Sequence, residues 1–294
     1  NYDGIPSQEA LLAHYAKSHL ALYFKDLFDG KKSVSYKPQR VELLPTLFKG
    51  TVYELLTKVD QRNVKDDLLV KLEMTHLKDR EISKLSGGEL QRLALIACMC
   101  KKADLYYFDE PATFLDITQR IAVAKIIRGL ANQFSVLVIE HDLATLDYLS
   151  DEIQIIYGEP AAYGVLSVSK SVKRGINEYL DGFLPDDNVR FRMYPISFGK
   201  GVETIFHEGV LFSYPGLKKS FGTLFSMDVA QGSIRKGEIL GIMGANGLGK
   251  STFLKIISGL ENADDVTLEK RSVSFKPQYL EASDETVQDY LQPE

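Results

Sequence analysis

Eight residues near the carboxyl end of the chain, 244–251, constrain the fold more than any other stretch because they read G-x-x-x-x-G-K-S. The largely apolar run Glu238–Met243 precedes them. The apolar positions of Phe253–Ile257 follow at helical spacing, with Gly259 where a helix C-cap is expected. This order predicts a buried strand, a glycine loop and a buried helix, which is the setting in which the pattern is specific.

The predicted loop has the chemistry of a nucleotide-phosphate site. Its backbone N–H groups can cradle phosphates, the Lys250 ammonium can reach the β- and γ-phosphates, and the Ser251 hydroxyl can ligate Mg²⁺. We therefore predict that ATP and Mg²⁺ bind here. The predicted nucleotide contacts in the loop are Gly244, Ala245, Asn246, Gly247, Leu248, Gly249, Lys250, Ser251 and Thr252. Upstream, Tyr214 is a candidate for stacking on the adenine, although a tyrosine near a turn is as often a packing residue.

A second anion site is predicted at a helix start within Leu85–Gln91. Ser86 and Glu89 have the S-x-x-E spacing of a capping box, and the glycines between them leave N–H groups open at the positive end of the helix. Ser86, Gly87 and Gly88 are therefore predicted to contact a phosphate, although an ordinary capped helix has the same spacing. The apolar residues that follow predict a helix with one buried face.

The apolar run Asp104–Phe108 is typical of a strand covered on both faces. The run Phe134–Ile139 predicts another buried strand, and a helical pattern separates the two. Strand, helix and strand in this order predict a parallel α/β sheet, whose ligands gather at the carboxyl ends of the strands. Asp109, Glu110 and His141 stand at those ends.

These strand-end residues have the chemistry of hydrolysis. Asp109 is placed to hold Mg²⁺ through water, and Glu110 is placed to polarise the attacking water as a general base. His141 is placed to hydrogen-bond the γ-phosphate. Gln39, which closes an earlier strand, is a candidate to bridge Mg²⁺ and the water. Asp116, a few residues past Glu110, is placed to reach a nucleotide across a subunit or domain seam.

The chain contains two copies of one short pattern, Lys32–Gln39 and Arg271–Gln278. They match at six of eight positions, and their offset is 239 residues (278 − 39). Each copy ends in a glutamine, so Gln278 is predicted to bind Mg²⁺ and nucleotide as Gln39 does. A Thr-Val pair opens an amphipathic segment after both copies. A repeat at about a domain's length predicts two copies of one fold.

Composition narrows the class of protein. A length of 294 residues with 45% hydrophobic residues suits two domains or parts of two. The net charge of −5 argues against a general nucleic-acid binder. Contact with RNA would come from a local patch such as Lys173, Arg174, Arg190 and Arg192. The apolar runs are shorter than the roughly 20 residues of a membrane span and no signal peptide is present, so we expect a cytoplasmic protein with no membrane partner.

The segment Ser171–Arg192 separates the two halves of the chain. It is rich in turn residues, including Gly175, Gly182 and Pro185, yet apolar residues recur among them. This composition predicts an ordered hinge rather than a loose linker.

The motifs, taken in order, resemble those of ATP-binding cassette ATPases: a strand-end glutamine, Leu-Ser-Gly-Gly-Glu, an aromatic-Asp-Glu-Pro and a strand-end histidine. More narrowly, the chain resembles subfamily E of that family, the RNase L inhibitor or ribosome-recycling group, over nearly its whole length. The stretches that carry this resemblance are Leu85–Arg92, Glu140–Ser150, Tyr157–Val165 and Gly175–Arg192. The resemblance implies a P-loop NTPase fold and a Mg²⁺-dependent ATP hydrolase.

The resemblance also implies a cellular role. The subfamily splits ribosomes after termination or rescue, binds the small subunit including its rRNA, and acts in initiation and ribosome maturation, in the cytoplasm and also in the nucleus. Termination or rescue factors and initiation factors are the implied partners. Two [4Fe–4S] clusters are implied for the subfamily, but the domain that carries them is absent from this sequence. Cys98 and Cys100 lie inside a predicted helix and are expected to be buried thiols.

The order of the motifs departs from that of one cassette. Within a cassette the phosphate loop comes first, but here Gly244 follows His141 by 103 residues (244 − 141). The sequence therefore predicts the back of one cassette in 1–168, a hinge in 169–195 and the front of a second cassette in 196–294.

Twin cassettes change the partner expected for the helix start at Ser86. In the closed form the amides of this helix start are expected to face the γ-phosphate held by Lys250. Neither ATP site is complete in this chain, so the chain alone should hydrolyse ATP poorly. Two other classes fit the motifs: an ATPase subunit of a membrane transporter, and a paired-cassette translation factor of another subfamily. The turn-rich hinge disfavours the latter, whose cassettes are joined by a long charged helix.

Overall fold

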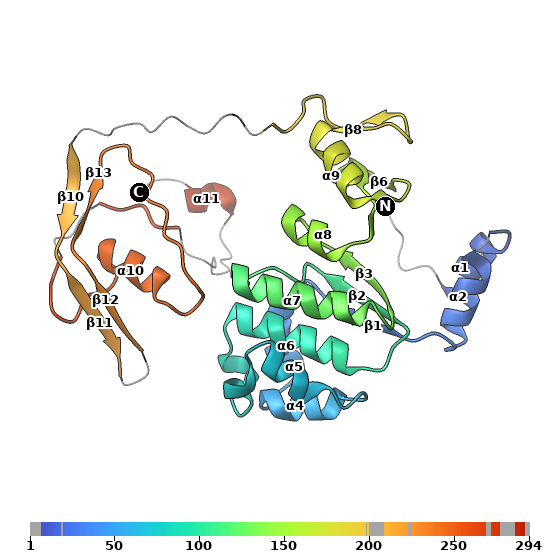
Figure 1. Cartoon of the computed structure of the whole chain (residues 1–294), viewed down its shortest axis with the longest axis horizontal. Helices are drawn as coiled ribbons and strands as arrows, with labels where there is room; N and C mark the ends of the chain where they lie inside the picture. The colour runs from blue at the N-terminus through green and yellow to red at the C-terminus, as the bar shows by residue number, and fades with distance from the viewer. Residues whose placement is uncertain are drawn as a thin grey trace. The chain divides into compact units, whose positions relative to one another are not determined.

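The computed structural model of the chain describes residues 7–18, 20–197, 199, 209–222, 225–268, 272–276 and 286–291. The chain divides into two compact units, Asn1–Gly201 and Val202–Glu294 (Figure 1). The segment predicted as a hinge, 169–195, lies within the first unit.

The first unit is built on a parallel sheet of three strands in the order β1-β2-β3. Strand β1 (Val34–Lys37) lies beside β2 (Leu105–Asp109), and β2 lies beside β3 (Ser135–Ile139). Leu105 is in register with the first residue of each neighbour. The sheet confirms the predicted parallel α/β fold, and it brings the carboxyl ends of all three strands to one edge (Figure 1).

Helices flank this sheet. They are α1 (Gln8–Tyr15), α2 (Leu20–Phe28), α3 (Leu44–Leu47), α4 (Val52–Val59), α5 (Lys65–Lys71), α6 (Gly87–Cys100), α7 (Ile117–Leu130) and α8 (Leu143–Leu149), with short 3₁₀ turns at Val41–Leu43, Thr75–Leu77 and Ile82–Lys84. Three of them, α4, α6 and α7, begin with capping boxes, formed by Thr51 with Glu54, by Ser86 with Glu89 and by Asp116 with Gln119. The capping box predicted from the S-x-x-E spacing at Ser86 is therefore confirmed.

One face of the sheet packs against α6 and α7. Tyr106 and Phe108 of β2 are buried there together with Ile127 of α7. Each such side chain stabilises the fold by roughly 1.5–3 kcal/mol relative to an exposed one. The prediction of a single buried face on α6 was wrong. Ten of its 14 residues are buried, including Leu95 and Ile96, because α4 and α5 also pack against this helix.

The opposite face of the sheet is largely open within the described residues. Four apolar side chains of β1 and β3 on this face are 38–54% exposed: Val34, Tyr36, Leu137 and Ile139. The prediction that β3 is buried was therefore wrong, because alternation turns only every second side chain toward α6 and α7. Strand β2, predicted to be covered on both faces, is buried on one face and half-buried on the other. On the open face the hydroxyl of Tyr107 hydrogen-bonds the hydroxyl of Tyr23 in α2 at 3.0 Å.

Beyond α8 the first unit continues in short antiparallel pairs and a helix. The pairs are β4 (Glu152–Ile153) with β7 (Lys170–Ser171), β5 (Ile156–Glu159) with β6 (Tyr163–Leu166), and β8 (Phe183–Leu184) with β9 (Val189–Arg190). Helix α9 (Val172–Asp181) follows β7. Gly175, expected in a turn, lies inside α9. A Cβ at this position would meet the side chain of Ile153 at 2.5 Å, so glycine lets the helix approach β4 closely.

Charged side chains hold this segment together. The buried Nζ of Lys170 lies 3.3 Å from a carboxylate oxygen of Glu178, and 3.5 and 3.7 Å from carboxylate oxygens of Asp186 and Asp187. Arg174 pairs with Glu178 at 2.6 Å and with Asp186 at 2.7 Å. This segment is ordered, as predicted, through a network of ion pairs, and its role as a hinge stays a prediction.

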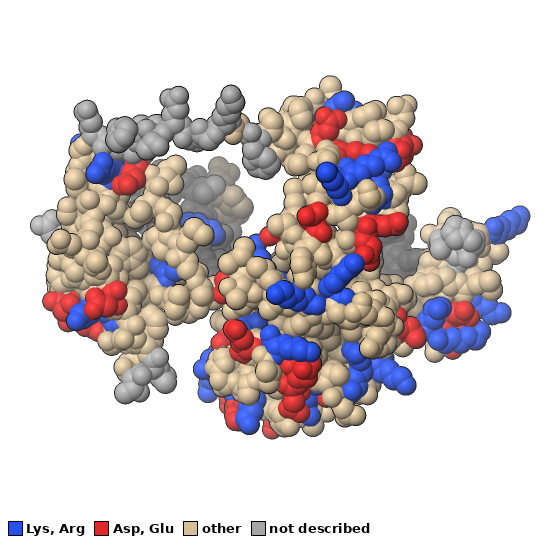
Figure 2. Space-filling model, viewed as in Figure 1, with Lys and Arg blue, Asp and Glu red and all other residues tan. Residues whose placement is uncertain are grey.

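Most of the basic patch suggested for RNA has partners inside this segment. Besides the ion pairs of Arg174, the Arg192 guanidinium donates to the Leu180 carbonyl at 2.7 Å, and the Arg190 guanidinium lies 5.1 Å from the centre of the Phe183 ring. Figure 2 shows basic and acidic side chains interleaved on the visible face. These cations stabilise the segment that contains them, and their contact with RNA stays a prediction.

The described residues of the second unit form two antiparallel pairs and two helices. The pairs are β10 (Val210–Tyr214) with β13 (Gly232–Arg235) and β11 (Leu217–Phe221) with β12 (Phe225–Val229), and the helices are α10 (Lys250–Ile257) and α11 (Val287–Leu291). Helix α10 ends in a Schellman motif. The Leu260 N–H donates to the Lys255 carbonyl at 2.9 Å, and Gly259 has a φ of 74°. The predicted glycine stop is confirmed.

The prediction of a buried strand before the phosphate loop was wrong. Residues 238–243 form no strand, and Ile239 and Met243 are 97% and 95% exposed. A strand depends on hydrogen bonds to a neighbour, and within the described residues no strand lies beside this run. Helix α10 likewise buries only Ile256, although a buried helix was predicted.

Candidate active site

The carboxyl edge of the three-stranded sheet brings together four predicted residues. Asp109 ends β2 and Glu110 follows it, while Gln39 and His141 each lie two residues past the end of a neighbouring strand. The Gln39 Nε2 donates to Glu110 Oε1 at 2.6 Å, and the His141 Nε2 lies 3.3 Å from the same oxygen. Parallel pairing thus joins residues that are far apart in the sequence.

Glu110 lies at the centre of this cluster. Its side chain is 17% exposed, and its Oε2 accepts a hydrogen bond from the Thr113 hydroxyl at 3.0 Å. Its backbone N–H donates to the Ile139 carbonyl at 2.8 Å, which fixes Glu110 to β3. The His141 side chain beside it is mostly exposed. A carboxylate held by polar donors and reachable from solvent has the placement that a general base needs.

Asp109 has a partner that sequence reasoning missed. The Tyr36 hydroxyl donates to Asp109 Oδ2 at 2.9 Å, and this hydrogen bond raises the pKa of Tyr36. Strand register could have predicted this contact. Tyr36 pairs with Tyr107, which lies two residues before Asp109, so all three side chains point to one face of the sheet. The oxygens of Asp109 and Gln39 are ligands of the kind that Mg²⁺ prefers, and both residues lie at this edge.

Lys37 is a second residue that the sequence alone did not single out. Its side chain is buried, and its Nζ donates to the Asp109 carbonyl at 2.7 Å and to the Glu110 carbonyl at 3.3 Å. Burial lowers the pKa of Lys37 to about 8, and the nearby carboxylates, Glu140 among them, oppose this shift. The available signal was a lysine directly before a proline, at the end of an alternating strand.

Acidic neighbours hold the turn that carries His141. The Glu140 carboxylate accepts hydrogen bonds from the backbone N–H groups of His141 at 2.8 Å, Asp142 at 3.2 Å and Ala112 at 3.2 Å. Asp142 caps α8, and its pKa is lowered first by the hydrogen bond from the Thr145 N–H. His141 therefore projects from a fixed turn.

The start of α6 has the geometry of an anion site. Ser86 is exposed before the first turn, and its N–H donates to the Glu89 carboxylate at 2.7 Å. Gly87 and Gly88 form the half-buried first turn of this long helix, whose macrodipole favours an anion. The contact of this helix start with a γ-phosphate bound at Lys250 stays a prediction.

Two other predicted nucleotide contacts have different outcomes. Asp116 is the N-cap of α7, where its Oδ1 accepts from the Gln119 N–H at 2.9 Å. This gives its carboxylate a role within its own unit, and a contact across a seam stays a prediction. Gln278 lies outside the described residues.

The phosphate loop, 244–251, leads directly into α10. Gly247 and Gly249 have φ angles of 82° and 88°, in the left-handed region that glycine adopts without strain. The Lys250 Nζ donates to the carbonyls of the first two loop residues at 2.7 and 2.6 Å, so its ammonium lies over the loop. A glycine loop closed by an ammonium at a helix start fits the phosphates of ATP.

Tyr214 makes packing contacts. Its ring meets the ring of Phe253 in α10 edge to face, with centroids 5.6 Å apart, and it lies against Gly232 of β13. These contacts fit the packing alternative for Tyr214, and stacking on the adenine stays a prediction.

Cys98 and Cys100 do not fit an iron–sulfur cluster. A [4Fe–4S] cluster takes four thiolates, whereas the chain has two cysteines, both buried in α6. Burial raises the pKa of Cys98 and raises that of Cys100 to about 12. The prediction of buried thiols is confirmed.

We expect both thiols to resist alkylation in the folded protein. At pH 8 the raised pKa lowers the thiolate fraction of Cys100 by about a thousandfold relative to an ordinary cysteine, and burial excludes the reagent. Iodoacetamide labelling followed by peptide mass spectrometry should leave both cysteines unmodified in the native protein and modify both in urea. Rapid native labelling of Cys100 would contradict its burial.

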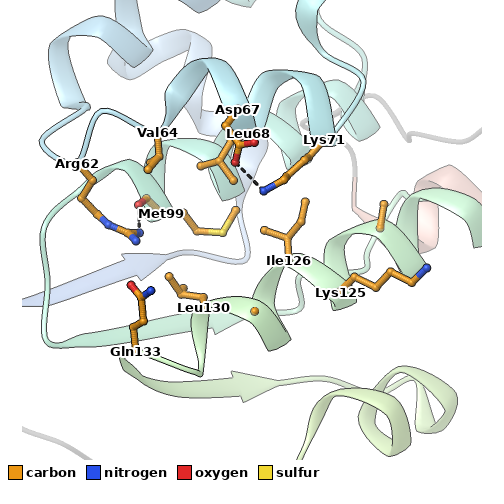
Figure 3. A pocket seen from close by; sticks show the side chains of 12 residues that line it. Arg62, Val64, Asp67, Leu68, Lys71, Met99, Lys125, Ile126, Leu130 and Gln133 are labelled. Carbon is orange, nitrogen blue, oxygen red and sulfur yellow. Dashed lines mark hydrogen bonds and ion pairs between the residues drawn. The ribbon is translucent and has the colours of Figure 1, made fainter.

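A pocket of about 520 Å³ lies between α5, α6 and α7 (Figure 3), and none of its lining residues belongs to the strand-end cluster. Met99, Ile126 and Leu130 line it. Arg62 donates to the Met99 carbonyl at 2.7 Å, and Lys71 pairs with a neighbouring aspartate at 2.7 Å. Its lining includes the carboxyl ends of α6 and α7, which lead into the amino ends of β2 and β3. The strand-end cluster lies at the opposite edge of the sheet.

Comparison with known proteins finds similarity over most of the chain. The sequence profile of the ABC transporter family matches residues 13–113 and 227–292, more than half of the chain. An uncharacterized ABC transporter ATP-binding protein of Methanocaldococcus jannaschii is 44% identical over 99% of this chain and 48% of its own length.

Two solved structures are also similar. One is the archaeal ribosome recycling factor aABCE1 in complex with the archaeal ribosomal stalk protein aP1, with 45% identity over 95% of this chain and 54% of that chain, at a TM-score of 0.80. The other comes from a model of ribosome-bound archaeal Pelota and ABCE1, with 46% identity over 96% of this chain and 48% of that chain, at a TM-score of 0.87.

The chain spans about half the length of these relatives. Among the residues that the structure describes, no helix combines the length and apolarity that crossing a membrane requires. The matched profile, together with the strand-end cluster and the phosphate loop, leads to one assignment: the chain, which is similar to structures of subfamily E, belongs to the ATP-binding cassette family.

Proposed function

We propose that the protein containing this chain is a Mg²⁺-dependent twin-cassette ATPase that uses ATP-driven closure to split ribosomes into subunits. The observation that carries the ATPase is the Glu110 carboxylate, held at the end of β2 with Gln39 at 2.6 Å and His141 at 3.3 Å. The ribosomal role is supported by similarity, over most of the chain, to a protein described as an archaeal ribosome recycling factor.

In the proposed reaction, water attacks the γ-phosphate and gives ADP and phosphate. Glu110 polarises the water, Gln39 orients it beside that carboxylate, and His141 hydrogen-bonds the γ-phosphate. Lys250 and the loop amides hold the β- and γ-phosphates of a second ATP. Mg²⁺, when bound, neutralises charge on the phosphate oxygens. Its ligands would come from Asp109, Gln39 and Gln278, and from Ser251 in the phosphate loop.

The proposed partners follow the same similarity. They are the ribosome, above all the small subunit with its rRNA, a termination or rescue factor, and initiation factors. Complexes of similar proteins with a ribosomal stalk protein, and with Pelota on the ribosome, support a ribosomal partner and a rescue factor. We place the protein in the cytoplasm, and also in the nucleus during ribosome maturation.

Co-sedimentation tests the ribosomal role. The intact protein is incubated with purified small ribosomal subunits and pelleted with a non-hydrolysable ATP analogue, with ADP or without nucleotide. If closure on ATP creates the binding form, the analogue should raise the pelleted fraction about fivefold or more over the other two conditions. Equal pelleting in all three conditions, or none, would contradict the proposed role.

A further inference from the structure

Glu110 has an unusual backbone. Its φ is 46°, in the left-handed region that residues with a Cβ enter only at a cost in strain. Such a conformation persists where the surroundings hold it. On one side, the Glu110 N–H donates to the Ile139 carbonyl at 2.8 Å. The carbonyl oxygen of Glu110 also needs a hydrogen-bond donor to fix this backbone.

Two buried side chains supply that partner. The Gln91 Nε2 donates to the Glu110 carbonyl at 2.7 Å, and the Lys37 Nζ donates to it at 3.3 Å and to the Asp109 carbonyl at 2.7 Å. Pro38 explains why the donor to these carbonyls is a side chain rather than a backbone N–H. It has no N–H, so it offers no backbone donor to β2 beyond Lys37, and the ammonium supplies one instead.

Both donors are buried although burial is unfavourable for them. Gln91 is fully buried and Lys37 is 1% exposed. The Oε1 of Gln91 has no hydrogen-bond partner within the described residues, so this amide is used through its N–H alone. An apolar side chain of similar size would avoid both desolvation costs. What these groups provide in return is the pair of hydrogen bonds that fix the Glu110 carbonyl.

We propose that Lys37 and Gln91 are positioning residues that lock the backbone of Glu110 and so aim its carboxylate at the attacking water. This inference rests on the proposed ATPase function. The lock joins three elements, because Lys37 ends β1, Gln91 lies in α6 and Ile139 ends β3. The helix that holds the general base is therefore the one that begins at Ser86.

Substitutions in the intact protein test the lock. Lys37→Met and Gln91→Met keep the length of each side chain and remove the donor. Each should lower kcat for ATP hydrolysis by about 10- to 100-fold, because a small displacement of the general base is enough to slow the chemical step. The KM and the affinity for ATP should stay within about twofold, because neither residue belongs to the phosphate loop. Lys32→Met and Gln133→Met, at exposed positions, are the matched controls.

A double-substitution cycle separates positioning from general loss of structure. If both residues act through Glu110, adding either change to Glu110→Gln should slow single-turnover hydrolysis no further. Full additivity would overturn the lock, as would unchanged kcat in both single variants of an active protein. Failure of both variants to fold, seen in thermal unfolding, would assign the pair to the fold instead. An inactive wild type would overturn the proposed ATPase function rather than the lock.

Discussion

Replacing Glu110 by glutamine should slow ATP hydrolysis by about 100-fold or more while ATP stays bound. The amide keeps the size of the carboxylate, and Gln39, Thr113 and His141 remain around it. It cannot take a proton from water, so only the chemical step is lost. Steady-state phosphate release measures turnover, and filter binding of labelled ATP measures retention.

The control for this prediction is Glu159→Gln, at an exposed position in β5. It removes one negative charge from the same unit without touching the strand-end cluster, so both turnover and retention should match the wild type. Hydrolysis by Glu110→Gln within about threefold of the wild type would remove Glu110 from the role of general base.

Replacing Lys250 by methionine should abolish tight ATP binding at the phosphate loop. The ammonium lies over the loop, where it donates to the carbonyls of Gly244 and Ala245 at 2.7 and 2.6 Å, and it is expected to exchange them for phosphate oxygens. Two charge-assisted hydrogen bonds of about 1.5 kcal/mol each correspond to roughly 100-fold in affinity.

Equilibrium binding of labelled ATP to the intact protein measures this loss. The number of tight sites should fall from two to one, because in the proposed twin-cassette protein the other cassette carries a phosphate loop of its own. Lys255→Met, an exposed lysine of the same helix, should leave both sites intact. Two tight sites in Lys250→Met would show that this loop does not hold the nucleotide.

The repeated pattern shows what local sequence can and cannot decide. Lys32–Gln39 and Arg271–Gln278 are nearly the same, yet the first copy contains strand β1 and the described part of the second, 272–276, is no strand. Lys37 is buried and Lys276 is exposed. The difference comes from β2 and α6, which lie beside the first copy. The apolar run 238–243 was mistaken for a buried strand for the same reason, because burial depends on neighbours that the pattern does not contain.

Much of the candidate site could be predicted because strand order and motif spacing determine it. Gln39, Glu110 and His141 follow parallel strands, so the prediction that they meet needed no knowledge of distances. Lys37 and Gln91 act on backbone carbonyls of other elements, and such contacts leave no spacing in the sequence. Gly175 is similar: its closeness to β4, rather than a turn, explains why a glycine stands there.

We propose that Glu110 drives hydrolysis in a protein that works on ribosomal subunits. The most direct test is the identity of the nucleotide on a subunit-bound protein. Small subunits are incubated with the intact protein and labelled ATP, and the sedimented complex is analysed by chromatography. The expected result is unhydrolysed ATP on the sedimented complex of Glu110→Gln. For the wild type we expect less sedimented protein and ADP mainly in the supernatant, because the ADP form binds small subunits weakly. Equal ADP on both complexes, or no labelled nucleotide on either, would contradict this proposal.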